Sequence, residues 1–326
     1  MSGDILLENL VSPITLAFLL GVLARLIKSD LEIPEPVMKI FSVFLLFSIG
    51  LQGGQELAKV AFADIAAGLG VTLVLVLALP GLAYLTARWL IGLDIRNAAG
   101  IAALYGSVSS VTFVVSRSYA EAQGTPMDAY VTALVAIMEL GMLVALFYGR
   151  LALSRDGAVT GSLGAILQET LRGRGIVLLG GGLFIGWAIG DTNFERIEPF
   201  FVDLFRGVLV LFLLEMGMAA AAQLRDFARL GPRILGFAIG VPMVNGTLAT
   251  CVATLAGLDL GSSAVLGAVA ASASYIDAPA AVRATFPEAN PSIYLTSSLG
   301  VTFPFMLILG IPIVYAIAAF WQGLLG

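Results

Sequence analysis

Long apolar segments recur along the whole chain, separated by short stretches rich in charged residues, glycine and proline. A run of about 20 apolar residues is long enough to cross a bilayer as a helix. The runs predict ten transmembrane helices, at about residues 12–27, 37–57, 65–90, 97–119, 129–153, 176–189, 200–224, 233–256, 262–284 and 292–320. We therefore expect an all-α polytopic membrane protein.

The two halves of the chain resemble each other. Residues 44–51 read Phe-Leu-Leu-Phe-Ser-Ile-Gly-Leu, and residues 211–218 read Leu-Phe-Leu-Leu-Glu-Met-Gly-Met, a displacement of 167. Earlier in the chain, Glu35-Pro36 pairs with Glu198-Pro199 at a displacement of 163. We expect a five-helix repeat over residues 1–153, a cytoplasmic linker over 154–175 and a second repeat over 176–326. Because five is odd, the second repeat enters the membrane inverted.

The placement of lysine and arginine predicts the orientation. If the central linker is cytoplasmic, the loops on its side of the membrane carry most of these residues, and the opposite side holds Lys59, Arg117 and Arg196. Cytoplasmic loops of membrane proteins are enriched in positive charge. We therefore expect a multi-pass protein of the cell inner (plasma) membrane with both termini outside.

Composition supports the membrane class and excludes others. Hydrophobic residues make up 59% of the chain and charged residues 12%, against roughly 25% charged in an average soluble domain. Histidine is absent, which removes the usual general base, the usual zinc ligand and any Ser-His-Asp triad. The single cysteine, Cys251, forms no disulfide within one chain, and no basic cluster indicates a nucleic-acid partner. An enzyme is therefore not expected.

Two hydroxyl-rich segments interrupt apolar runs. The first contains Gly106, Ser107, Ser109, Ser110 and Thr112, and the second contains Ser272 and Ser274. A broken helix in a bilayer must face protein or water, and its resumed N-terminus attracts an anion. The repeat therefore predicts that the fourth and ninth helices are broken, cross near the membrane midplane and bind a small monoanion with these residues. Alternatively, each hydroxyl bonds to a carbonyl of its own helix.

Three carboxylates lie in apolar segments. Glu139, Glu215 and Asp277 would each be costly to expose to lipid, so each should face the protein interior. A carboxylate beside an anion site repels the substrate unless a cation neutralises it. Glu139 and Asp277 are therefore candidate sites for sodium or a proton, although Asp277 before Ala278-Pro279 also reads as an N-cap. Glu215 has a second interpretation, pairing with Arg206 or a neighbouring helix.

With these residues in view, the chain resembles the sodium-dependent bicarbonate transporter family over nearly its whole length. The segments that carry the resemblance are residues 106–112, 206–218, 271–283, 288–294 and 297–302. The resemblance implies two inverted five-helix repeats with a core part and a gate part, often a homotrimer. It also implies bicarbonate between the two broken-helix ends, held by Ser107, Ser109, Ser110, Ser272 and Ser274, with sodium close by and an acid at Glu139.

The sequence departs from the family pattern at three places. Tyr275 stands where the family has an acid directly after the serines of the ninth helix, and the acid follows two positions later as Asp277. Glu139 replaces an aspartate. The linker is also short, which argues against the PII-like regulatory partner known for members with a longer linker.

These observations predict a secondary active transporter that carries bicarbonate, or a similar small monoanion, by sodium-coupled symport and alternating access. Sodium would be the coupling ion. Two alternatives remain open: a proton- or sodium-coupled carrier of a small organic carboxylate, and an anion channel or facilitator.

Overall fold

The computed structural model describes residues 13–128, 130–155, 172, 174–227, 231–275 and 278–325. Over these ranges the regular structure is helical throughout, with no strand. The predicted linker 154–175 falls largely outside the described residues. The all-helical prediction is confirmed.

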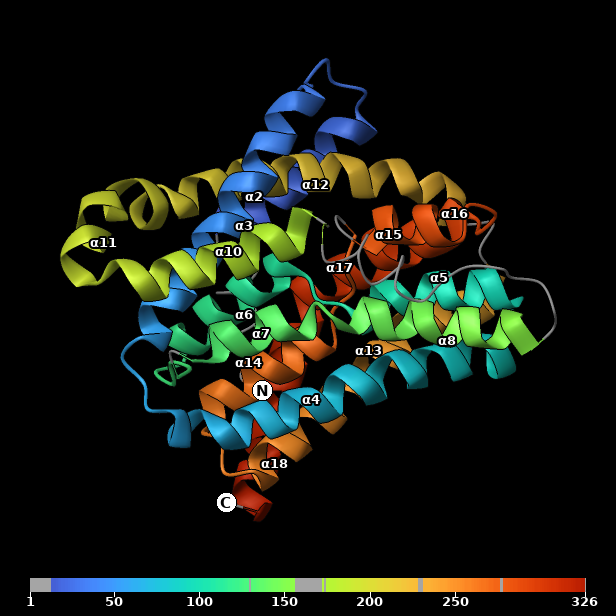
Figure 1. The fold of residues 1–326 in the computed structure, drawn as a ribbon. Coiled ribbons are helices and arrows are strands. Elements are labelled where there is room, and N and C mark those ends of the chain that lie inside the picture. The colour runs from blue at the N-terminus through green and yellow to red at the C-terminus, as the bar shows by residue number, and fades with distance from the viewer. Residues whose placement is uncertain are drawn as a thin grey trace.

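The helices of the first half follow the predicted segments closely (Figure 1). They are α2 (Pro13–Leu26), α3 (Glu35–Leu57), α4 (Phe62–Leu85) with the π-helical η1 (Thr86–Ile91), α5 (Ile95–Gly106), α6 (Ser110–Ala122), α7 (Val131–Met138) and α8 (Gly141–Arg155).

The second half is more subdivided. It contains α10 (Arg174–Ile189), α11 (Asp191–Glu198), η2 (Pro199–Asp203), α12 (Phe205–Phe227), α13 (Gly231–Leu255), α14 (Leu260–Ala270), α15 (Ala278–Thr285), α16 (Pro291–Leu295), η3 (Thr296–Thr302), α17 (Phe303–Phe305), η4 (Met306–Gly310) and α18 (Ile311–Leu325).

Six helical segments of the described chain are long and apolar enough to cross a membrane. They are Glu35–Leu57, Ile65–Ile91, Ile95–Ala122, Val131–Leu153, Gly231–Leu255 and Pro291–Leu325. Of the most apolar window of Ile95–Ala122, 94% is buried inside the protein, against 39% for Ile65–Ile91. The segment that carries the first hydroxyl cluster is therefore enclosed by other helices, as its polar residues require.

Two pairs of helices cross at very close range. A Cβ atom at Gly21 of α2 would lie 1.9 Å from the Leu214 carbonyl oxygen of α12, and one at Gly217 would lie 2.0 Å from that of Phe18. A Cβ at Gly54 of α3 would likewise lie 2.0 Å from the Leu183 oxygen of α10. Because glycine has no Cβ, the backbones of α2 and α12, and of α3 and α10, can touch.

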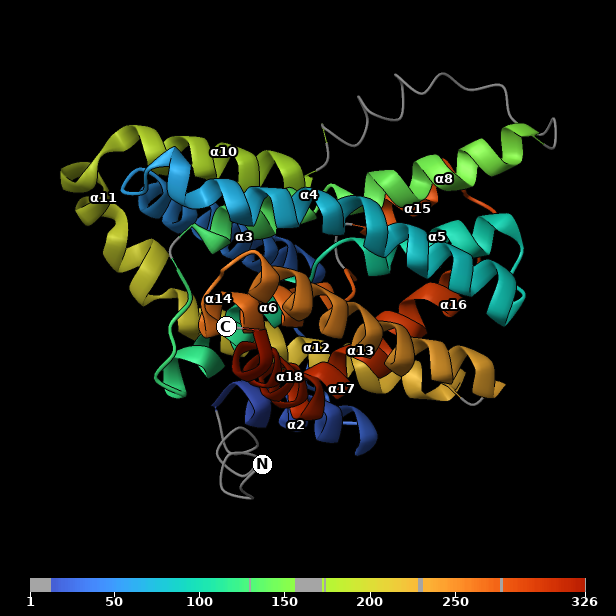
Figure 2. The ribbon, with the colours of Figure 1, turned by 90° about the horizontal axis from the view of Figure 1, so that it is seen from below.

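The remaining long helices form a second group, which holds both interrupted helices (Figure 2). In this group α5 packs against α4 and α8, and α14 packs against α13 and α18. The resumed helices cross over, since α6 packs on α14 and α15 packs on α5. Each half of the chain therefore supplies one helix segment to the packing of the other.

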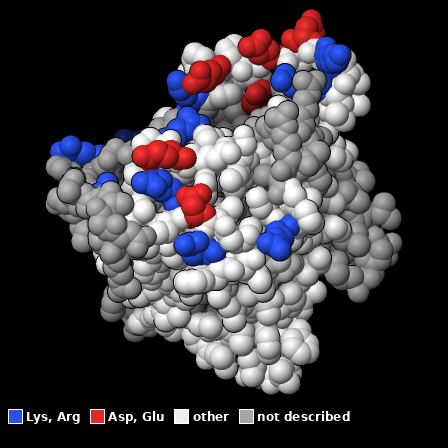
Figure 3. All heavy atoms as spheres, turned by 90° about the vertical axis from the view of Figure 1, so that its right-hand side faces the viewer, with Lys and Arg blue, Asp and Glu red and all other residues white. Residues whose placement is uncertain are grey.

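Charged side chains gather over one part of the face in Figure 3, beside a larger area without Lys, Arg, Asp or Glu. Among the charged residues, Arg96, in the first turn of α5, pairs with Glu288 at 3.6 Å. The Asn290 N–H also donates to the Asn97 side chain at 2.7 Å. These polar contacts join the start of α5 to the segment before α16.

The structure differs from the sequence-based prediction in the fifth segment. A single helix was expected over residues 129–153, but α7 ends at Met138 and α8 begins at Gly141. Beside this turn, a Cβ at Gly141 would lie 1.8 Å from the Gly106 carbonyl oxygen, so the start of α8 packs closely against the end of α5. Glu139 therefore lies in a two-residue turn within the membrane-length helical segment Val131–Leu153.

Candidate substrate site at the two helix breaks

The first break separates α5 from α6 at residues 107–109. Ser107 has an extended backbone after the last turn of α5, and Ser109 is the N-cap of α6. The Ser109 hydroxyl accepts a hydrogen bond from the Thr112 N–H at 3.2 Å. Serine is among the best N-cap residues because its oxygen satisfies an otherwise unpaired N–H of the first turn. The sequence thus starts a new helix here.

The second break follows α14. Ser272, Ala273 and Ser274 are not helical, and the Ser274 hydroxyl accepts from the Ala278 N–H at 3.3 Å, at the start of α15. Pro279 lies in the first turn of α15, where its missing N–H costs little. The predicted cation-site residue Asp277 lies outside the described residues.

The two breaks contact each other directly. The Ser109 N–H donates to the Ser272 hydroxyl at 2.9 Å, and the Ser274 N–H donates to the Leu104 carbonyl at 2.8 Å. The Ser272 hydroxyl donates in turn to the Val269 carbonyl of its own helix at 2.6 Å. These bonds satisfy backbone groups that the interruptions would otherwise leave unpaired.

The candidate substrate residues share one buried region but differ in how they are bonded. Ser107, Ser109, Thr112, Ser272 and Ser274 are buried, whereas Ser110, the first residue of α6, is half-buried. Ser272 uses its hydroxyl both to donate and to accept. It therefore has a structural role, which agrees with the alternative interpretation of own-helix bonding.

Two other hydroxyls at the breaks have no such role. The Ser107 and Tyr275 hydroxyl oxygens are buried without a hydrogen-bond partner among the described residues. The Tyr275 hydroxyl lies close to the Ser109 side chain, which is a weak partner at most, and its ring packs on Phe303 with centroids 5.0 Å apart. A buried unpaired hydroxyl is costly, so the Ser107 hydroxyl above all, and that of Tyr275 beside it, are suited to a ligand. From the sequence, Tyr275 stood out only because it replaces the acid of the family pattern. Its position directly after Ser274 in the second hydroxyl-rich segment could have indicated a role in the site.

Glu139 lies beside the first break. The residue is 3% exposed, and its Oε2 accepts from the Val108 N–H at 3.4 Å. A buried carboxylate next to an anion site favours a neutralising cation or proton. Among the described residues no group of three or more His, Cys, Asp or Glu side chains is placed to hold a metal ion. A cation here would also need neutral oxygens, and Ser107 and the nearby backbone carry such oxygens.

Three further polar residues lie away from the breaks in sequence. Arg206, at the start of α12, pairs with Glu121 at 3.7 Å. Glu215 lies instead near Arg25 and the backbone of Ile33, with its Oε2 lacking a hydrogen-bond partner in the described region, so the suggested pairing with Arg206 is not observed. Asn245 of α13 is fully buried, and neither polar atom of its amide has a partner in the same part of the chain.

An all-helical chain with six long apolar segments, whose interrupted helices meet in a buried polar site, has the features of a membrane transporter. Comparison with protein families identifies the class of transporter. The chain belongs to the Na⁺-dependent bicarbonate transporter superfamily, which it matches over residues 13–319. A search of curated proteins finds no match to the chain.

Proposed function

We propose that this protein is a secondary active transporter that moves bicarbonate, or a similarly small monoanion, together with sodium by alternating access. The observation that carries the proposal is the meeting of the two helix breaks. The N-termini of α6 and α15 begin at this junction, where Ser109 and Ser272 are hydrogen-bonded at 2.9 Å. Helix N-termini favour negative charge, and the unpaired Ser107 hydroxyl adds a donor.

The architecture we propose has ten transmembrane helices in two inverted five-helix repeats, over residues 1–153 and 176–326. The glycine contacts support it, because they occur as equivalent pairs. Gly21 against Leu214 corresponds to Gly186 against Leu51, and Gly217 against Phe18 corresponds to Gly54 against Leu183. An inverted duplication would produce such pairs, since each contact between the halves is then made twice.

This correspondence implies a register for the repeat. Gly54 and Gly217 play the same part in the packing and are 163 positions apart, as are Glu35 and Glu198. In the same architecture the 154–175 linker is cytoplasmic, both termini lie outside and the breaks cross near the membrane midplane. The family resemblance adds the expectation of a homotrimer in the inner membrane, which light scattering of the purified protein can test.

Sodium coupling rests on Glu139. Its buried carboxylate lies within hydrogen-bonding distance of the Val108 N–H at the first break, in the neighbourhood proposed for the anion. Sodium held by Glu139 would lower the repulsion between that carboxylate and bicarbonate, and the two ions would bind cooperatively. Asp277 remains the second proposed contributor to the cation site.

Uptake by proteoliposomes tests the proposal. Purified protein is reconstituted, and uptake of ¹⁴C-bicarbonate is followed at alkaline pH with an inward sodium gradient, with the same gradient of potassium, and in empty liposomes. We expect uptake above that of empty liposomes only with sodium. Uptake driven by a proton gradient and indifferent to sodium would favour the proton-coupled carrier, and passive uptake in both salts would favour a channel.

A further inference from the structure

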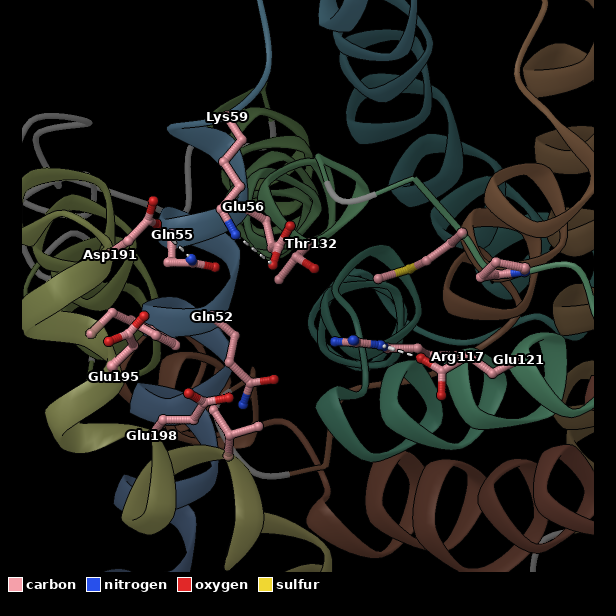
Figure 4. A pocket seen from close by; sticks show the side chains of 14 residues that line it. Gln52, Gln55, Glu56, Lys59, Arg117, Glu121, Thr132, Asp191, Glu195 and Glu198 are labelled. Atoms are coloured by element: carbon pink, nitrogen blue, oxygen red, sulfur yellow. Dashed lines mark hydrogen bonds and ion pairs between the residues drawn. The ribbon is translucent and has the colours of Figure 1, made fainter.

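A cavity of about 540 Å³ opens between α6 and α7 on one side and α3 and α11 on the other (Figure 4). Carboxylates from α3 and α11 lie along one side of it, among them Glu56, Glu195 and Glu198. Arg117 and Glu121 of α6 face them across the cavity. In the orientation proposed above, this cavity opens to the outside.

A second cavity, of about 110 Å³, adjoins the first and shares Gln52, Arg117 and Glu121 with it. The charged residues of its lining are Arg117, Arg206 and Glu121, so positive charge predominates. In the larger cavity acidic residues outnumber basic ones. One water needs roughly 10–15 Å³ of such volume. A four-heavy-atom anion can therefore enter together with part of its hydration shell.

Glu121 lies between the two arginines of this smaller cavity. Its Oε1 is 2.8 Å from Arg117 Nε, and its Oε2 is 3.7 Å from Arg206 Nη2. The side chains are 35%, 40% and 78% exposed, in the order Glu121, Arg117 and Arg206. Ion pairs this exposed contribute little to stability, so they exchange readily. A guanidinium recognises planar oxyanions, and bicarbonate presents the same planar CO₂⁻ group as Glu121.

The arginines are connected to the candidate substrate site along α6. Ser110, Val114, Arg117 and Glu121 follow one another at intervals of four, three and four residues, and therefore share one face of the helix. Val114, Arg117 and Glu121 line the smaller cavity, and half-buried Ser110 begins α6 at the first break.

We propose that Arg117 and Arg206 form an outer docking subsite for the transported anion, in which the anion displaces the carboxylate of Glu121 before it moves along α6 to the helix breaks. This inference rests on the proposed function and adds an entry step to it. Arg117 belongs to α6 and Arg206 to α12, so the subsite joins the helix group that holds the breaks to the group of closely crossing helices.

Cysteine labelling tests anion docking without transport. Ser118 lines the smaller cavity, and Cys251 is the only native cysteine. In the C251A/S118C protein, an anionic sulfonate methanethiosulfonate should react several-fold faster than a cationic trimethylammonium one, after correction for their rates with a free thiol. Sodium bicarbonate should slow the reaction. R117Q and R206Q should abolish the preference.

K59Q is the matched control. Lys59 lines the larger cavity, is absent from the lining of the smaller one, and pairs with Glu56 at 3.5 Å. K59Q removes the same charge from the same side of the protein, and should leave the labelling preference unchanged. An equal effect of K59Q and R117Q, or no preference in the parent protein, would overturn the docking subsite.

Transport kinetics separate this inference from the proposed function. R117Q and R206Q should raise KM for external bicarbonate roughly two- to fivefold, the size of effect expected for an exposed ion pair, with little change in the maximal rate. E121Q should lower KM, and R117K should fall between R117Q and the wild type. Wild-type KM in both R117Q and R206Q would overturn docking while the function stands. Absence of bicarbonate uptake by the wild type would refute the function, and labelling would still decide the subsite.

Discussion

The Ser109 N–H donates a 2.9 Å hydrogen bond to the Ser272 hydroxyl, which joins the two helix breaks into one unit. Ser272 also donates to the Val269 carbonyl, so its only O–H is used within the protein. Ser107, by contrast, has a buried hydroxyl with no partner in the described part of the chain. Serines that look alike in the sequence therefore have different roles, and substitutions can tell these roles apart.

Ser272→Ala should destabilise the protein. The substitution leaves the buried Ser109 N–H without an acceptor, which costs about 1–3 kcal/mol. Unfolding of the purified protein in detergent would measure it. Ser42→Ala is the control, because Ser42 is buried but bonds only to Met38 of its own helix at 2.9 Å, and its loss should be nearly neutral. Equal stability of S272A and S42A would contradict a linking role for Ser272.

Ser107→Ala should have the opposite profile. Removing an unpaired buried hydroxyl should leave stability unchanged or slightly raised, while loss of a hydrogen bond to a charged substrate should cost about 1.5–3 kcal/mol of affinity. KM for bicarbonate would then rise about tenfold or more. Tyr275→Phe should behave in the same way. Unaltered KM in both variants would show that neither hydroxyl contacts the anion.

Glu139→Gln should abolish sodium dependence of uptake, because the neutral amide no longer attracts a cation. Glu139→Asp keeps the charge and should retain part of the activity, at a higher sodium concentration for half-maximal rate. The measurement is uptake against sodium concentration, together with stabilisation of the detergent-purified protein by sodium chloride relative to choline chloride. A wild-type sodium response in E139Q would place the cation elsewhere.

Gly141→Ala should disturb the junction between α7 and α8. Its Cβ would lie 1.8 Å from the Gly106 carbonyl oxygen, a backbone atom that cannot move without shifting the first break. Overpacking of this kind costs about 1–3 kcal/mol or more. Gly70→Ala in α4 is the control, since no atom outside its own helix lies within 4 Å of the added Cβ. Thermal unfolding should separate the two variants, and equal stability would contradict the close approach.

Asp128 provides a pH-dependent prediction at the loop between α6 and α7. Burial, and then the neighbouring Asp259 carboxylate, raise the pKa of Asp128 above its ordinary value of 3.8. The folded state therefore holds this proton more tightly than the unfolded state, so the contribution of Asp128 to stability is greatest at low pH. That contribution is lost as pH rises through the raised pKa.

The sign of this effect can be tested with Asp128→Asn. The amide removes the repulsion from Asp259 and should raise the unfolding temperature at pH 7 more than at pH 4. Asp128 also faces Tyr130 and Ser262, which favour its charged form, so the gain should be modest. A gain that is larger at pH 4 than at pH 7 would contradict the assignment.

Much of the fold was predictable from short-range pattern. Apolar runs of membrane-spanning length predicted the helices, and serines followed by a resumed apolar run predicted the break at Ser109, because an N-cap needs only the residue itself and the next three N–H groups. The same local reasoning located Glu139 and the second hydroxyl-rich segment.

The register of the proposed repeat is where sequence pattern and helix packing differ. Matching residue types align Gly50 with Gly217, whereas in the proposed repeat the close helix crossings favour Gly54 as the equivalent of Gly217. Apolar residues are largely interchangeable in a lipid-facing helix, so letters align ambiguously. A close helix crossing accepts only glycine, because a Cβ would clash with the facing backbone. Such a contact therefore indicates which glycines correspond in the proposed repeat.

By itself, the sequence determined the all-helical membrane class, the family and the segments in which polar residues interrupt helices, since these depend on composition and on neighbours along the chain. Tertiary structure alone decided the junction at Glu139, the bond between Ser109 and Ser272, and which hydroxyls remain unpaired. The physical reason is that a hydroxyl bonds to whichever group lies about 3 Å away. For Ser109 that group lies 163 residues further along the chain.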